Sequence, residues 1–244
     1  MPNLVELADI VADALELPRK SAQWMARLGR DAGCLSTGGR GRHVPKATSQ
    51  DAANLIIAMM VCSKAARAPE YMQDFGDLLL FPEFTTRPEQ EGEFARRLFV
   101  PKANFRGCIA GIIDLLGSIE YARTLDIDEL IGGDFAPADS IVPPIDLTIQ
   151  DTTLRADITF EKGTYGFQHA DLADLADWKA AGPVFWSALG ASSAVMTRYK
   201  TAVKSRRRIE CDVLLKVAAG LHGHSFVDLL VKAGGEKVLK RDAL

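Results

Sequence analysis

The stretch 18–48 constrains the fold of this chain most, because it combines an amphipathic helix, a glycine-rich turn and a basic arm. Pro18 suits the first helical position, where its missing N–H is not needed. Gly33 is a suitable C-terminal stop for that helix. Residues 34–37 then predict a short strand, and Gly38-Gly39 predicts a hairpin turn that requires positive φ. The stretch therefore predicts a helix followed by a small wing.

The predicted helix has two different faces. Large apolar side chains lie on one of them at helical spacing, namely Trp24, Met25 and Leu28. Long polar donors lie on the other, namely Lys20, Gln23, Arg27 and Arg30. Residues three and four apart share one side of a helix. We therefore expect the apolar face to dock, with Trp24 packed under a first helix over residues 3–16, and the polar face to remain available to a partner.

Charge is concentrated in the same stretch. Between residues 17 and 48 there are seven Lys or Arg residues against the single acid Asp31, a net charge of about +6, whereas the whole chain carries 29 basic and 32 acidic residues. A local basic excess of this kind is typical of a nucleic-acid site, although a basic amphipathic helix can also be a solvated surface. The residues predicted to contact DNA are Lys20, Ser21, Gln23, Arg27, Arg30, Thr37, Arg40, Arg42, His43 and Lys46.

The order of helix, glycine-rich turn and apolar helix resembles a known family. The chain reads "RLGRDAG", then "CLSTGGRGRHVPKAT", then "SQDAANLIIAMM". It resembles the N-terminal winged helix-turn-helix of regulators found in prophages and gene transfer agents of alphaproteobacteria, over about residues 4–60. The matching residues are Gly33, Leu35, Gly38, Gly39, Arg40, Gly41, Arg42, Thr48, Asp51, Ala52 and Ala53. Cys34 departs from the pattern, which more often has Leu there. The resemblance implies a DNA-binding regulator, with neither activation nor repression specified.

The rest of the chain predicts helices followed by a smaller antiparallel β part, an α+β fold. Asn3 and Thr48 are candidate helix caps. The apolar helix over 51–66 is interpreted as core between two halves of the molecule, with a dimer seam as the alternative. One long helix is expected over 102–121. Four strands are expected after a composition shift at residue 140, over 145–149, 154–160, 165–167 and 206–209. Helices are expected at 213–221 and about 226–233.

These patterns divide the chain into three regions. They are a winged helix-turn-helix domain at 1–48, a helical connecting region at 49–139, and an α+β region at 140–244 for oligomerisation or partner binding. Double-stranded DNA is the expected partner. RNA polymerase or a DNA-bending architectural protein, and a second copy of the chain in a homodimer, are further candidates. The basic residues 206–208 indicate either a charge-protected strand edge or a second contact.

No catalytic, cofactor-binding or metal site is predicted. The chain has no P-loop, no Gly-x-Gly-x-x-Gly after a strand and no nucleophile elbow. His222-Gly223-His224 is interpreted as a turn and the acidic stretch 126–139 as a solvated linker. No run of about 18 apolar residues is present, and the N-terminus lacks a basic signal-peptide region. We therefore expect a non-enzymatic protein of the bacterial cytoplasm, at the nucleoid.

The leading functional hypothesis is a DNA-binding transcriptional regulator of phage-like or gene-transfer-agent genes. It would read promoter DNA with a recognition helix and a Gly/Arg wing. Two alternatives remain open at this point. One is a DNA-packaging or replication adaptor of a prophage, and the other is an enzyme whose site the sequence does not reveal.

Overall fold

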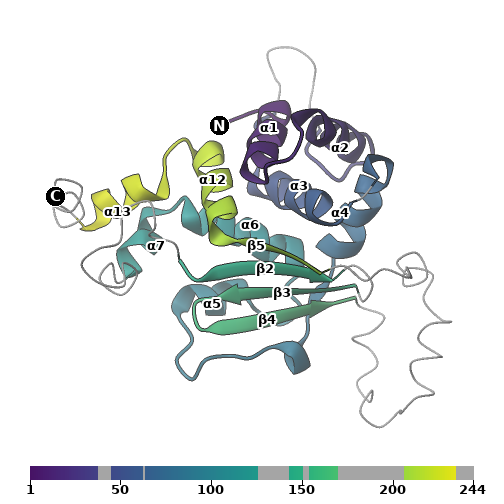
Figure 1. The fold of residues 1–244 in the computed structure, drawn as a ribbon. Coiled ribbons are helices and arrows are strands. Elements are labelled where there is room, and N and C mark those ends of the chain that lie inside the picture. The colour runs from purple at the N-terminus through teal and green to yellow at the C-terminus, as the bar shows by residue number, and fades with distance from the viewer. Residues whose placement is uncertain (38–44, 63, 126–142, 151–153, 170–205, 235–244) are drawn as a thin grey trace, which may run out of the picture.

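The architecture is α+β, as predicted, with helices above and around one antiparallel sheet (Figure 1). The computed structural model describes residues 1–37, 45–62, 64–125, 143–150, 154–169 and 206–234. The acidic stretch 126–139 and the helical segments expected between 170 and 204 lie outside these residues.

The first helix, α1 (Leu4–Ala14), begins at a cap that the sequence predicts. The Asn3 side chain accepts hydrogen bonds from the backbone N–H groups of Val5 at 2.9 Å and Glu6 at 3.0 Å. The Glu6 carboxylate accepts one from the Asn3 N–H at 2.9 Å. This reciprocal capping satisfies N–H groups that a helix start leaves without partners. The prediction of Asn3 as a cap is confirmed.

The second helix, α2 (Arg19–Asp31), begins directly after Pro18 and ends near Gly33, whose φ is +76°. The strand predicted at 34–37 is wrong, because no strand forms there. The backbone N–H of Ser36 donates to the Asp51 carboxylate at 2.7 Å, so this donor is taken by a side chain and not by a β-ladder. The predicted turn at Gly38-Gly39 lies outside the described residues.

The prediction that Trp24 packs under α1 is also wrong. Trp24 is 48% exposed, whereas Ala22, Met25, Ala26 and Gly29 are buried, so Met25 docks as predicted and Trp24 does not. A Cβ at Gly29 would lie 2.8 Å from the Met72 sulfur and 2.9 Å from Leu35 Cδ1, so a larger residue there would require these side chains to move. Met25 and three small residues therefore form the packed face of α2, and the small residues allow the neighbouring segments to come close.

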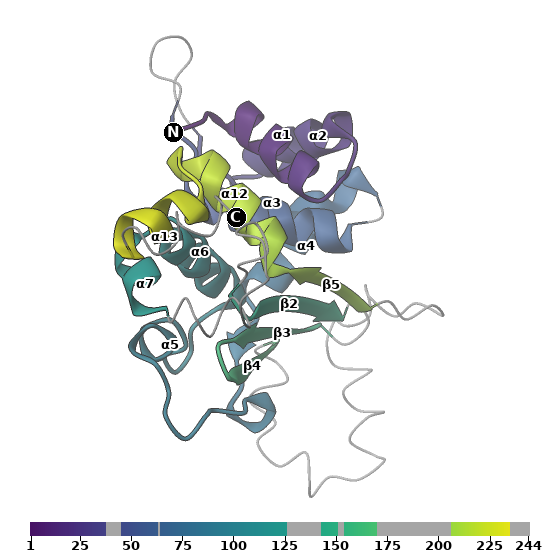
Figure 2. The same cartoon turned by 60° about the vertical axis from the view of Figure 1, so that its left-hand side comes forward.

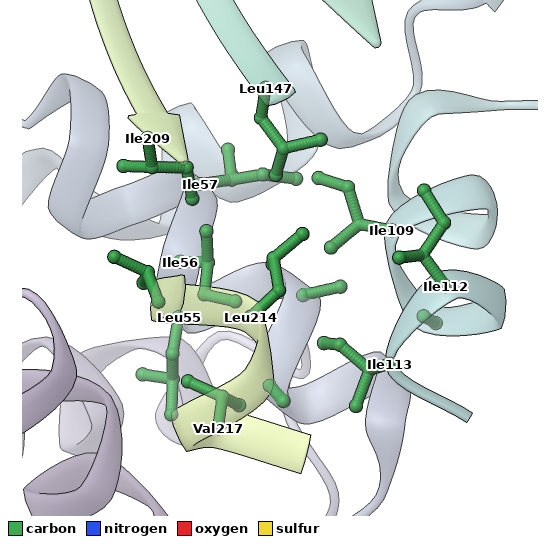
Figure 3. Close-up of a cluster of buried hydrophobic side chains, with 14 of the residues drawn as sticks. Leu55, Ile56, Ile57, Ile109, Ile112, Ile113, Leu147, Ile209, Leu214 and Val217 are labelled. Atoms are coloured by element: carbon green, nitrogen blue, oxygen red, sulfur yellow. The ribbon is translucent and has the colours of Figure 1, made fainter. Parts of the chain in front are cut away.

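The third helix, α3 (Ser49–Val61), lies at the centre of the molecule. Its predicted cap is confirmed, with Thr48 accepting from the Asp51 N–H and the Asp51 carboxylate accepting from the Thr48 N–H. Every residue from Asp51 to Val61 is buried. Figure 3 shows side chains of α3 surrounded by isoleucines, leucines and a valine from other helices and strands. The interpretation of this helix as core is confirmed, although it ends at Val61 and not near residue 66 as predicted.

Short helices follow α3 and lead to the sheet. They are the 3-10 helix η1 (Ala65–Arg67), α4 (Ala68–Gly76), the 3-10 helix η2 (Pro82–Phe84), α5 (Glu93–Leu98), α6 (Phe105–Leu116) and α7 (Ile119–Thr124). The long helix predicted over 102–121 is therefore wrong, because α6 ends at Leu116 and α7 starts afresh. Ser118 caps the new helix by accepting from the Glu120 N–H at 3.1 Å. Apolar side chains keep their helical spacing across the break between α6 and α7, so the sequence pattern did not reveal the break.

The sheet has five antiparallel strands in the order β1-β4-β3-β2-β5. They are β1 (Leu79–Leu80), β2 (Ile145–Gln150), β3 (Arg155–Phe160), β4 (Gly163–Gln168) and β5 (Arg206–Glu210). The four predicted strands are confirmed, whereas β1 was not predicted. Alternating burial in β3 follows its alternating sequence, and β1 is too short to show any alternation.

Two C-terminal helices, α12 (Cys211–His222) and α13 (Phe226–Gly234), return the chain to its N-terminal part. Both views show α12 beside α1 (Figures 1 and 2), and a Cβ at Gly220 would lie 2.7 Å from Ile10 Cγ2. One buried core includes residues from all three predicted regions. The division at residues 48 and 139 stays a prediction.

Among the described residues, no single helix is long and apolar enough to cross a membrane. Only α12 and α13 taken together reach that length and composition, and they are bent by 82° at the break between them.

Candidate nucleic-acid interface

The helices α1 and α2 form a tight pair joined by residues 15–18. Glu16 takes a positive φ of 55°, and the Leu17 N–H donates to the Ala12 carbonyl at 2.8 Å. A short connection of this kind is what a helix-turn-helix requires. It holds α2 against α1, so one long side of α2 is covered and the other faces outward.

The side of α2 next to α1 is joined to it by polar contacts. The Arg19 guanidinium donates from Nε and Nη2 to the Asp13 carboxylate at 2.7 and 2.6 Å. The same hydrogen bonds lower the pKa of Asp13 and raise the pKa of Arg19. Further along, Gln23 Nε2 donates to Asp9 Oδ1 at 2.7 Å. The amide of Gln23, predicted to face a partner, is thus engaged within the α1–α2 seam.

Next to this seam, α2 carries an outward ridge, which we define as Lys20, Trp24 and Arg27. All three side chains are exposed, and the Arg27 guanidinium carbon lies 5.6 Å from the centroid of the Trp24 ring. Ser21 and Arg30 are exposed beside the ridge. Asp31 lies at the C-terminal end of the ridge. Its carboxylate oxygens are 3.8 Å from Arg27 Nε and 3.4 Å from Arg30 Nη2. Exposed pairs of this kind are weak and can exchange for other anions.

Tertiary structure changes the charge balance that the sequence suggested. The stretch 17–48 is basic by itself, but the seam places the α1 carboxylates of Asp9 and Asp13 against one side of α2. Glu6 and Glu16 are exposed on or next to α1 as well. An anionic partner is therefore repelled from the seam side and attracted to the outward ridge and the arm.

The ends of the basic arm are fixed on the same core. Ser36 is held by Asp51, while Lys46 pairs with Asn3 in an isolated antiparallel bridge and the Ala47 N–H donates to the Pro2 carbonyl at 2.9 Å. Thr37 and Lys46 are both exposed. Arg40, Arg42 and His43 lie outside the described residues. The two described ends of the arm therefore lie near the start of α1 and the start of α3.

A second basic cluster lies on β5 at the edge of the sheet. Arg206, Arg207 and Arg208 are all exposed there, and Arg208 Nη2 donates to Asp146 Oδ2 at 2.9 Å. Charged residues on an edge strand discourage pairing with other chains. The position agrees with the edge interpretation, and a second contact stays a prediction.

A polar pocket of about 400 Å³ lies on another face, lined by Gly33, Cys34, Gln73, Asp74, Asp77, Arg106 and His169. Burial raises the pKa of the Cys34 thiol, which keeps it protonated and weakly nucleophilic. The Arg106 side chain is already engaged, donating to Asp77 and, at 3.3 Å, to Asn54 Oδ1. In the described ranges, no group of three or more His, Cys, Asp or Glu residues is placed to hold a metal ion.

Sequence reasoning missed the exposure of Trp24, although one signal was present. Ala22, Ala26 and Gly29 recur at helical spacing, as small residues do where two helices approach closely.

Comparison of the chain with protein-family models, with curated proteins and with solved structures finds no match.

Proposed function

We propose that this protein is a DNA-binding transcriptional regulator of phage-like or gene-transfer-agent genes, acting at the bacterial nucleoid. One observation carries the proposal. A helix that follows another after a four-residue connection exposes Lys20, Arg27 and Arg30, and a Gly/Arg-rich arm follows it directly. This is the order of parts in a winged helix-turn-helix, and the proposal assigns the chain no catalytic step.

The geometry supports a particular mode of binding. In a helix-turn-helix, residues near the start of the second helix reach base edges and later ones contact the backbone. Lys20 and Ser21 stand at that start and are exposed, so we assign base contacts to them. Arg27 and Arg30 are assigned to phosphates. Gln23 is assigned to the seam with Asp9, where it orients α2 on α1.

The arm supplies the other half of the proposed contact. Arg40 and Arg42 alternate with glycines, which let an arginine lie close to a phosphate backbone or enter a minor groove. Each phosphate contact releases counterions and adds about 0.9 to the slope of log affinity against log salt. The arm therefore contributes a salt-dependent attraction that has little dependence on base sequence.

The test is a salt titration of binding to genomic DNA from around the gene, located by footprinting. Arg40→Ala with Arg42→Ala should weaken binding to all DNA and reduce the salt slope by about 1.8. The matched control is Arg96→Ala with Arg97→Ala, two exposed arginines on α5. An unchanged slope in the arm variant, or an equal loss in the control, would contradict the proposal.

Sequence preference distinguishes the regulator from a DNA-packaging or replication adaptor. A regulator should protect one defined site and bind it at least about a thousandfold more tightly than scrambled DNA. Equal affinity for both, together with ring-shaped oligomers by electron microscopy, would favour the adaptor.

A further inference from the structure

Trp24 is an unusual surface residue of this molecule. Five large apolar side chains are exposed among the described residues, and Trp24 is the aromatic one of the five: Met1, Val5, Leu17, Trp24 and Val100. It is also the only member of that set within the basic surface of α2. Its position calls for a specific explanation, because aromatic side chains are enriched where a protein meets a partner.

Two features prepare the Trp24 ring for an external contact. Its indole N–H has no hydrogen-bond acceptor in the part of the chain that the structure describes. Its ring has the Arg27 guanidinium 5.6 Å from its centroid, and a cation over an aromatic face restricts where the ring can turn. The side chain therefore offers an apolar surface and a free donor from one defined place on the helix.

Charge indicates what that partner is. Lys20 precedes Trp24 by one helical turn and Arg27 follows it by almost one turn, and both are exposed. An apolar ring between two cations suits a surface that carries phosphates on either side of an apolar group. The major groove of DNA is such a surface, because phosphates border it and the thymine methyl group is its apolar feature.

We infer that Trp24 reads DNA by packing its indole ring against the 5-methyl group of a thymine in the major groove. The inference rests on the proposed function and names the base that this ridge selects. Arg27 positions the ring through a flanking phosphate, and Lys20, which is assigned to a base edge, lies one turn before the ring. The indole N–H is free to donate to the O4 atom of thymine or to an N7 atom beside it.

The shape of the ridge favours duplex over single-stranded DNA. Single strands are bound in grooves that follow their backbone and stack bases on aromatic side chains. Trp24 is 48% exposed on the outer side of α2, next to the seam with α1. A convex helix fits into the major groove, which is wide enough to admit it.

The experiment removes single methyl groups from the DNA. Binding sites are selected from a random duplex pool with the full chain, and each thymine of the selected site is then replaced by uracil, which lacks the methyl group. Replacement at one position should weaken binding of the unchanged protein about fourfold, the loss expected for one buried methyl group. Trp24→Ala should bind thymine and uracil sites equally, whereas Trp24→Phe should keep part of the difference.

A matched control uses another exposed apolar side chain. Val5 is 56% exposed on α1, so Val5→Ala should retain the full thymine preference. Thermal unfolding of each variant, followed by circular dichroism, establishes that Trp24→Ala is folded. If this variant does not fold, the comparison of Trp24→Phe with the unchanged protein decides the question.

The outcomes separate this inference from the proposed function. Salt-dependent binding to a selected site, with the same thymine preference in Trp24→Ala, overturns the role of Trp24 and leaves the regulator in place. The absence of binding to any duplex overturns both. Fluorescence adds a direct test in a Trp178→Phe, Trp186→Phe background, where duplex should quench Trp24 emission. Quenching by single strands alone would replace the groove contact with base stacking.

Discussion

The helices α2 and α3 have 13 residues each and follow one another in the chain, yet they are stabilised in opposite ways. α3 is buried on every side from Asp51 to Val61 and contacts α1, α2, α4, α6 and β5. α2 buries a narrow strip of small residues and exposes a charged ridge. One helix is therefore the centre of the core, and the other is a surface element that rests on it.

Under the proposed function, this difference separates residues that determine stability from residues that bind DNA within a short stretch of sequence. Changes in α3 should act on the free energy of unfolding, because its side chains fill the core. Changes on the outer side of α2 should act on binding, because exposed side chains contribute little to stability. Substitutions in the two helices therefore test the comparison directly.

The largest effect is expected at the centre of α3. Ile56 is fully buried, so Ile56→Ala should lower the free energy of unfolding by about 2–5 kcal/mol through lost burial and a cavity. Urea unfolding followed by circular dichroism measures the change. Lys20→Ala on α2 is the control, with a change within about 0.5 kcal/mol. Similar losses of unfolding free energy in both variants would contradict the conclusion that α3 is a core helix and α2 a surface helix.

The next effect concerns the start of α3. The buried Asp51 carboxylate accepts hydrogen bonds from the N–H and hydroxyl of Ser36 and of Thr48, at 2.7–2.8 Å. Asp51→Ala leaves these donors without a partner and should cost about 2–3 kcal/mol. Asp31→Ala removes an exposed carboxylate from the end of α2 and should cost less than about 1 kcal/mol. Equal costs would show that the Asp51 network contributes no more than a surface pair.

The stability loss caused by truncating Trp24 measures how much the outer side of α2 contributes to packing. A fully buried tryptophan truncated to alanine would cost about 3–5 kcal/mol. Because Trp24 is 48% exposed and alanine is the better helix former, we expect Trp24→Ala to cost about 1.5 kcal/mol. Thermal and urea unfolding both report this value. A loss above about 3 kcal/mol would restore the packing role that the sequence predicted for it.

The smallest effect is expected in the seam. Gln23→Ala removes the hydrogen bond to Asp9 and should cost about 1 kcal/mol of stability, while binding to specific and scrambled DNA changes by the same small factor. Urea unfolding and a binding titration are compared on one preparation. Unchanged stability with a loss of about 1–3 kcal/mol on the specific site alone would show that Gln23 reads adenine, as its amide is able to do.

Much of the fold followed from local patterns in the sequence. The caps at Asn3 and Thr48, and the strands of the C-terminal sheet, depend on residues close together in the chain, so a short window contains the whole signal. The candidate site was predicted in part, since Lys20, Arg27 and Arg30 are exposed as expected. Gln23 is not free, because its partner Asp9 lies on another helix.

The remaining differences have a common cause in contacts between distant segments. Ser36 bonds to Asp51 and does not join a strand, because the buried carboxylate is available to it only in the folded chain. The two residues of β1 become a strand only because β4 lies next to them. The break after Leu116 depends on the Ser118 cap, which the apolar periodicity on both sides conceals.

The sequence by itself determined where most helices and the four longer strands form, because capping, periodicity and alternation act over a few residues. Only the tertiary structure decided which side of α2 is packed and which is free. Hydrophobicity ranks Trp24 above Ala22, Ala26 and Gly29, yet these three are buried with Met25 where α2 approaches its neighbours closely, and a Cβ at Gly29 would lie 2.8 Å from the Met72 sulfur. Close packing therefore placed Met25 and the small residues in the interior and left Trp24 on the outer ridge.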